Sequence, residues 1–210
     1  LKGFQKGFIT YGLHLAPSTL SGRNVCPNAS PGCAAACLNT AGRGMMNMVQ
    51  EARINKTNKF FDNKYEFVLQ LVKDIQAGIR FATRKQMEVC FRLNLTSDIR
   101  WEKYGIRQEF SKYQFYDYTK IPTRKINGID NYHLTWSYSE ANKKYAKLFN
   151  KVVENKAVVF RKDIPKTFKG LEVINGDEHD MRFLDKDNVV VGLKAKGKAK
   201  QDMSGFVIHV

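Results

Sequence analysis

The sequence predicts an α/β fold, a partial (β/α)6-type barrel built from parallel βα units. Segments with strand-like and helix-like spacing of apolar residues alternate along most of the 210 residues, which is the order that parallel βα units produce. The length suits a single domain, and a hydrophobic content of 43% is ordinary for a globular protein. A doubly wound open sheet is the alternative architecture. In both, the functional site lies at the carboxyl ends of the strands.

The first half of the chain is expected to form a strand, two helices and a second strand. In order, these segments are 7–15, 45–61, 65–78 and 87–96. The second helix is expected to end at Gly78, since glycine commonly terminates helices. The second strand alternates cleanly, so that Val89 and Phe91 lie on one face, and Cys90 and Arg92 on the other.

The second half continues this alternation of strands and helices. We expect a short helix over 101–110, strands over 113–118 and 132–137, a helix over 140–154, and strands over 156–160 and 170–174. Residues 1–180 would then form the α/β domain. The remaining 181–210 would form a C-terminal β extension packed on it, with a β-hairpin around Lys186-Asp187-Asn188 and an edge strand over 206–210.

Three of the four cysteines lie in one stretch of small residues, 24–44, directly after the first predicted strand. Cys26, Cys33 and Cys37 are spaced C-x6-C-x3-C among Pro, Gly, Ala, Ser and Asn. Small side chains and glycine let a chain wrap closely around a bound group. The stretch, called the cysteine loop below, therefore indicates a metal or cluster site, or else a disulfide.

An iron–sulfur cluster fits the spacing of the cysteine loop best. Structural zinc sites take C-x2-4-C pairs completed by a second Cys or His pair, and the first gap here is longer. A chain of this length can form a core without disulfides. Three thiolates can ligate three irons of a cubane and leave the fourth for another ligand. We therefore expect a [4Fe–4S] cluster on Cys26, Cys33 and Cys37, with zinc and a disulfide as the alternatives.

Two resemblances rest on these residues. The block Cys26-Pro-Asn-Ala-Ser-Pro-Gly-Cys33-Ala-Ala-Ala-Cys37-Leu, with Gly42-Arg-Gly44 and Arg92-Leu-Asn-Leu-Thr-Ser-Asp98-Ile, resembles a family of uncharacterised bacteriophage proteins over most of the chain. More distantly, the chain resembles radical SAM enzymes, whose three cluster cysteines follow the first strand of a partial (β/α)6 barrel and leave one iron open for S-adenosylmethionine.

The chain departs from the radical SAM pattern in two places. That family usually has C-x3-C-x2-C, and a Gly-Gly-Glu segment after its second strand; here the spacing is C-x6-C-x3-C, and residues 94–98 take the place of that segment. The resemblance implies a cluster-binding protein that, if it is catalytic, uses S-adenosylmethionine.

Polar side chains near predicted strand ends are further site candidates. Arg92, Asn94 and Asp98 are candidates for catalysis, because a buried arginine needs an acceptor and a strand-end carboxylate can bind substrate. Asp98 can equally cap the following helix. Candidates for binding a cofactor lie at or just beyond strand ends: Ser97, Lys120, Trp136 and Arg161.

The fourth iron has two candidate ligands in this chain. His14 ends the first predicted strand, and Cys90 shares a strand face with Arg92 and Asn94. Cys90 lies about 20 Å before the end of its strand, so it is also a candidate for a small buried apolar group. The run Asp177-Glu178-His179-Asp180 is dense in metal-binding and proton-transferring residue types, or is an exposed acidic turn.

The formal net charge of +15 predicts a polyanionic partner. The second hypothesis is therefore a nucleic-acid-binding phage protein whose cluster is only structural, and the third is a virion component; the bland alternative is a solvated basic surface. No apolar run approaches the ~20 residues that cross a bilayer, so we expect no membrane association. We expect the host-cell cytoplasm, or a virion, as its location.

Overall fold

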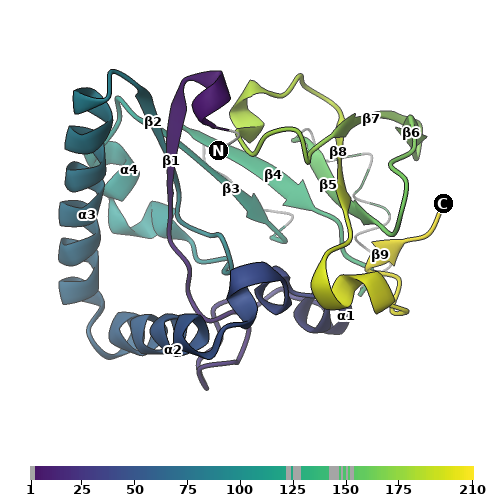
Figure 1. The fold of residues 1–210 in the computed structure, drawn as a ribbon, viewed down its shortest axis with the longest axis horizontal. Helices are drawn as coiled ribbons and strands as arrows, with labels where there is room; N and C mark the ends of the chain where they lie inside the picture. The colour runs from purple at the N-terminus through teal and green to yellow at the C-terminus, as the bar shows by residue number, and fades with distance from the viewer. Residues whose placement is uncertain are drawn as a thin grey trace.

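The computed structural model describes residues 3–121, 124, 129–141, 147, 149, 151 and 154–210, and within them a mostly parallel sheet (Figure 1). Nine strands of this part form it in the order β1-β2-β3-β4-β5-β8-β7-β6, with β9 paired to β5. The strands are β1 Phe8–Gly12, β2 Glu88–Arg92, β3 Gln114–Thr119, β4 Tyr132–Ser137, β5 Lys156–Phe160, β6 Thr167–Phe168, β7 Leu171–Asn175, β8 Val190–Lys194 and β9 Val207–Ile208. The predicted α/β class is confirmed.

The strand order shows how the chain crosses the sheet. From β1 to β5 each strand pairs in parallel with the next one in sequence, and within the described residues only β6 and β7 pair antiparallel. A doubly wound sheet reverses its order partway, and no reversal occurs between β1 and β5. The carboxyl ends of these strands therefore meet at one edge, as the sequence predicted for the functional site.

The helices of the described residues are α1 Pro31–Ala35, α2 Asn47–Asp62, α3 Lys64–Arg84 and α4 Ile106–Glu109. Short 3-10 turns are η1 Phe4–Lys6, η2 Leu38–Thr40, η3 Gly42–Met45, η4 Trp101–Tyr104, η5 Arg182–Leu184 and η6 Gly197–Gln201. None of these helices is long and apolar enough to cross a membrane. The helix predicted over 140–154 falls largely on residues outside those described.

The two faces of the sheet differ in chemistry, as the alternation in β2 predicted. Val89 and Phe91 point toward α2 and α3 and pack in the largest apolar core, around Phe60 and Trp101. Cys90 lies on the opposite face in a small cluster with Tyr116 and Met181. The face that carries Val89 and Phe91 therefore packs in the hydrophobic core. The face that carries Cys90 holds the polar groups of the site.

The C-terminal hairpin predicted within residues 181–193 is wrong. Its first half forms the turn η5, and its second half forms β8, which lies parallel between β5 and β7 inside the main sheet. The physical reason is the apolar run Val189-Val190-Val191, of which each residue is almost fully buried. A run buried on both faces is typical of a central parallel strand, and a surface hairpin could not cover it.

The second long helix does not end at Gly78 as predicted but continues to Arg84. Gly78 is buried where α3 meets β1, and a Cβ placed on it would lie 3.0 Å from the Tyr11 ring. The missing side chain lets α3 approach the sheet, so this glycine is a packing residue and not a helix stop.

Replacing Gly78 by valine should lower the free energy of unfolding by about 1–3 kcal/mol, the usual cost of overpacking, even though valine forms helix more readily than glycine. The control is Ala77→Val at an exposed position of the same helix, which should cost less than about 1 kcal/mol. Urea unfolding followed by circular dichroism measures both. Equal losses would contradict the packing role.

Candidate functional site

A cavity of about 530 Å³ lies at the edge where the parallel strands end, and all three cysteines of the loop line it. Cys26, Cys33 and Cys37 contribute from the loop, while Arg92 and Lys120 contribute from the ends of β2 and β3. Figure 1 shows β3 and β4 pointing toward α1 and the loop around it. The sequence prediction that the site follows the strand ends thus agrees with where this cavity lies.

Local hydrogen bonds fold the middle of the cysteine loop into α1. The Ser30 hydroxyl accepts a hydrogen bond from the Cys33 amide at 3.1 Å, a helix N-cap, and Pro31 follows at the first helical position. The Glu140 carboxylate then accepts from the Ser30 hydroxyl at 2.8 Å and from the Gly32 amide at 3.1 Å. Glu140 therefore ties the loop to the segment that follows β4.

Glycine is required at position 32 because the C-terminal segment packs directly on it. A Cβ there would lie 1.9 Å from the Ser204 hydroxyl oxygen and 2.9 Å from the Phe206 Cβ. Further along, Ala36 packs with Ala195 and Ala199 in a small apolar cluster. The small residues of the loop thus serve close packing against residues 195–207, as well as leaving room for the cavity.

The first cysteine is held through its neighbours. The Asp98 amide donates to the Val25 carbonyl at 2.8 Å, which fixes the loop beside the end of β2. The Cys26 sulfur accepts from the Ser18 amide at 3.5 Å and lies 3.6 Å from the Thr96 carbonyl. Both contacts of this sulfur come from the backbone, and the Asn24 side-chain oxygen accepts from the Cys26 amide at 2.8 Å.

The three thiols of the loop are unbridged, and burial disfavours their thiolate forms. No disulfide joins any of the four cysteines. Burial raises the pKa of Cys26 to about 12, and it also raises the pKa of Cys33 and Cys37. The Lys120 ammonium opposes this for Cys33, with which it forms a hydrogen bond. Arg53 acts likewise on Cys37. Cations are therefore already placed to stabilise thiolates.

Asp98 is a structural hub of the site. Its carboxylate accepts from the Thr119 hydroxyl and the Lys120 amide, both at 2.8 Å, and from Arg124 at 3.1 Å. The Arg124 side chain is fully buried and also binds Glu102. The charge of an arginine favours an exposed position, but two carboxylates hold Arg124 inside the protein.

Asn94 and Ser97 also serve the fold. The Asn94 side-chain oxygen accepts from the Ser97 hydroxyl at 2.8 Å and from the Trp101 indole at 3.1 Å. Its side-chain amide donates to Ile99 and to buried Asp117. The two residues line the cavity, but their side chains are used to hold the turn after β2.

Arg92 and the acidic run after β7 meet across the cavity. Arg92 donates to both carboxylate oxygens of Asp180, at 2.8 and 3.1 Å, and lies 4.5 Å from the Tyr118 ring centre. Asp177 and His179 line the same cavity, and Asp177 pairs with Lys196. The run is therefore part of the cavity wall, with two of its carboxylates in ion pairs.

Four of the predicted site residues do not line this cavity. Trp136 packs against Phe149 in a second apolar core. Arg161 holds the carbonyl groups of Lys200 and Asp202. Cys90 is fully buried, 3.2 Å from the Thr10 hydroxyl. Burial and the nearby Arg53, Lys56 and Arg92 lower the pKa of His14 to about 4, and its buried Nδ1 has no hydrogen-bond partner within the described part of the chain.

Sequence reasoning missed Glu140 and Arg53. Glu140 follows the end of β4 by three residues, so the rule that strand ends carry functional side chains could have found it. Arg53 lies in α2 and donates to the Asn39 side chain within the cysteine loop. Nothing in the helical spacing distinguishes it from its exposed neighbours.

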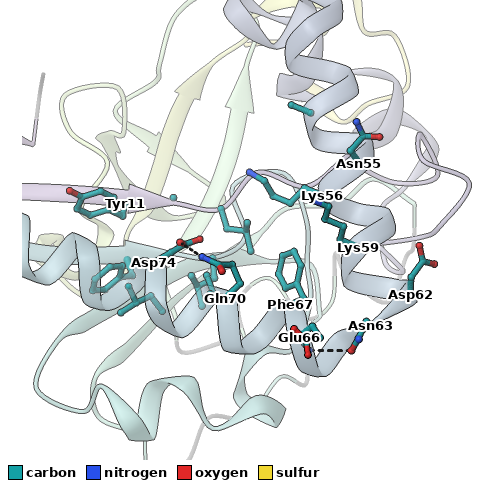
Figure 2. Close-up of a pocket in the computed structure, with 17 residues that line it drawn as sticks. Tyr11, Asn55, Lys56, Lys59, Asp62, Asn63, Glu66, Phe67, Gln70 and Asp74 are labelled. Carbon is teal, nitrogen blue, oxygen red and sulfur yellow. Dashed lines mark hydrogen bonds between the residues drawn. The ribbon is translucent and has the colours of Figure 1, made fainter.

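A second cavity, of about 760 Å³, lies on the other face of the sheet between α2 and α3 (Figure 2). Apolar side chains such as Leu13 and Leu71 line it, and charged residues stand around it: Lys56, Lys59, Asp62, Glu66 and Asp74. None of the cysteines reaches it. In the sequence, these residues had the ordinary pattern of amphipathic helices and did not stand out.

Among the described residues, no group of three or more His, Cys, Asp or Glu side chains is arranged to hold a metal ion. A single zinc ion needs its ligands to converge on one point. The thiols of a cubane each bind a different iron and stand further apart. The finding therefore argues against a site for a single metal ion. It does not test the cluster, which stays a hypothesis.

Comparison with known proteins identifies the family of the chain. The family model described as Gene product 88, a phage-type family, matches residues 2–210. Neither the curated proteins nor the solved structures contain a match to the chain. The resemblance to phage proteins is thereby supported, and the resemblance to radical SAM enzymes remains a hypothesis.

Asp98→Ala should lower the free energy of unfolding by about 3 kcal/mol, because it removes a carboxylate from a fully buried arginine. Glu172→Ala is the control: it breaks a pair with Lys186 in which both side chains are exposed, and should cost less than about 1 kcal/mol. Urea unfolding of both variants tests this. A small loss for Asp98→Ala would mean that its carboxylate is available for chemistry.

Proposed function

The chain belongs to the Gene product 88 family, and we propose that it is an iron–sulfur protein whose cluster is held by Cys26, Cys33 and Cys37. The family description names no activity, so the proposal rests on the site. Its main support is that three unbridged thiols from one loop line one cavity at the carboxyl edge of a parallel sheet.

The chemistry around the thiols suits a thiolate-bound cluster. A cluster requires deprotonated cysteines, and Lys120 and Arg53 already favour the thiolate at Cys33 and Cys37. Apolar side chains, among them Leu95 and Phe206, line the same cavity and limit the access of water. When bound, the cluster would supply one-electron redox chemistry, and an iron open to a further ligand.

We propose that no cysteine completes the cluster. Cys90 and His14, the two candidates for a fourth ligand, do not line the cavity. Cys90 instead contacts the Thr10 hydroxyl of β1, two residues before Arg92 at the end of β2. A fourth iron would then be left for a ligand from outside the chain, in a cavity that Arg92 and Tyr118 also line.

The finer architecture that we propose is a partial (β/α)6-type barrel, similar to the radical SAM core. The consecutive parallel order from β1 to β5 supports it. Binding of S-adenosylmethionine has less support, because Asn94 and Ser97, which stand where that family has its Gly-Gly-Glu segment, use their side chains within the turn. An enzyme and a cluster protein without S-adenosylmethionine chemistry are both consistent with the site.

Anaerobic purification should give a brown protein with about four irons per chain and a broad absorption band at about 400 nm. Cys33→Ala should lose the band and most of the iron, because it removes one of three thiolates. Cys90→Ala is the matched control and should keep both. Iron, sulfide and zinc analysis of the three proteins provides the measurement. A colourless protein with one zinc, or without metal, would refute the proposal.

Incubating the reduced, cluster-loaded protein with S-adenosylmethionine tests whether it is an enzyme of the radical SAM type. If it is, incubation with S-adenosylmethionine should release 5′-deoxyadenosine, measured by chromatography, and Cys33→Ala should release none. Repeated absence of this product from protein with a full complement of iron would exclude the enzymatic version and leave cluster binding intact.

A further inference from the structure

Large apolar side chains are exposed in a group around the cysteine loop. More than half of each side chain is open to solvent at Leu38, Met45, Met46 and Met48. Exposed apolar residues scattered singly need no explanation, but a group of them marks an interaction site. These four residues, with the exposed lysines Lys196, Lys198 and Lys200, are called the mouth surface below.

Contacts between backbone segments join the lysines of the mouth surface to the segment that carries Leu38. The Lys198 amide donates to the Thr40 hydroxyl at 3.3 Å, and a Cβ on Gly197 would lie 2.6 Å from the Thr40 carbonyl. The lysine-bearing turn η6 therefore packs on η2, which begins at Leu38. Figure 1 shows this yellow segment beside the blue turns of the cysteine loop.

The mouth surface borders the cavity of the three thiols. Leu38 and Lys196 each belong to both, since they also line the cavity. Leu38 follows Cys37 directly in sequence and is 58% exposed. A molecule seated on Leu38 would therefore stand one residue away from a proposed cluster ligand.

The composition of the surface identifies the kind of partner. Methionine side chains are flexible and polarisable, and suit surfaces that adapt to another protein. An apolar centre with a charged rim is typical of protein–protein interfaces, whereas phosphate groups need cations and no exposed methionine. Lys196 already pairs with Asp177, and the remaining rim lysines, Lys198 and Lys200, favour an acidic protein.

We propose that the mouth surface docks a small acidic electron-transfer protein, which exchanges one electron with the cluster. This inference rests on the proposed function for the role of the partner, but docking itself does not need the cluster. In the exchange, the donor loses one electron and the cluster gains it, so that no bond forms or breaks and no further reactant is required.

The test compares two surface double variants with a control of equal charge. Lys198→Glu with Lys200→Glu reverses the rim, and Met45→Gln with Met48→Gln removes exposed apolar groups. The control, Lys73→Glu with Arg80→Glu, makes the same charge change on exposed positions of α3, which Figure 1 places on the opposite side of the molecule. An acidic plant-type ferredoxin serves as the partner probe.

Each mouth variant should weaken ferredoxin binding on the order of tenfold, measured by calorimetric titration, and the control by much less. Reduction of the cluster by reduced ferredoxin should slow by a similar factor, while reduction by dithionite should match that of the control. Equal weakening by the rim variant and the control would overturn the proposal, and so would no binding at low salt.

Two further outcomes separate this inference from its alternatives. If the protein holds no cluster, the proposed function fails, but the titration still tests the docking surface. If a DNA or RNA oligonucleotide binds more tightly than ferredoxin, and Met45→Gln with Met48→Gln leaves that binding unchanged, the lysines belong to a nucleic-acid interface and the docking proposal is wrong.

Discussion

The buried carboxylate of Asp98 is the interaction on which the site depends. It joins the end of β2 to the end of β3 through Thr119 and Lys120, and its own amide holds the cysteine loop at Val25. Lys120, fixed in this way, reaches Cys33. A residue type that suggests catalysis thus also has a structural task, which is to set the distance between the thiols and the cations that would stabilise them.

A second constraint comes from the opposite side of the loop. Glu140 holds the start of α1, and residues around Phe206 pack so closely on Gly32 that no side chain fits there. The loop is therefore clamped between the end of β4 and the C-terminal segment. Preorganised ligands lose less entropy when a metal group binds, so this clamping is what a cluster site on a flexible, small-residue loop requires.

Most of the strands could be predicted from sequence, because alternation and β-forming residues are local signals. β4 and β5 match their predicted ranges, and the cysteines lie at the expected edge. Gly78 and the run at Val190 could not be assigned correctly, since each depends on a partner far away in the chain: Tyr11 and strand β5. The burial of Arg124 could not be predicted for the same reason. Its charge predicts exposure, and only the fold reveals the two carboxylates that surround it.

The cavity is closed by segments that lie far apart in sequence, the loop around Gly32 and the stretch 195–207. Contacts of such long range tend to form late in folding, because the entropy of closing a long loop opposes them. The thiols would therefore remain accessible until β8 and β9 join the sheet. A cofactor would be delivered during this period of folding. Oxidation of the accessible thiols would compete with that delivery.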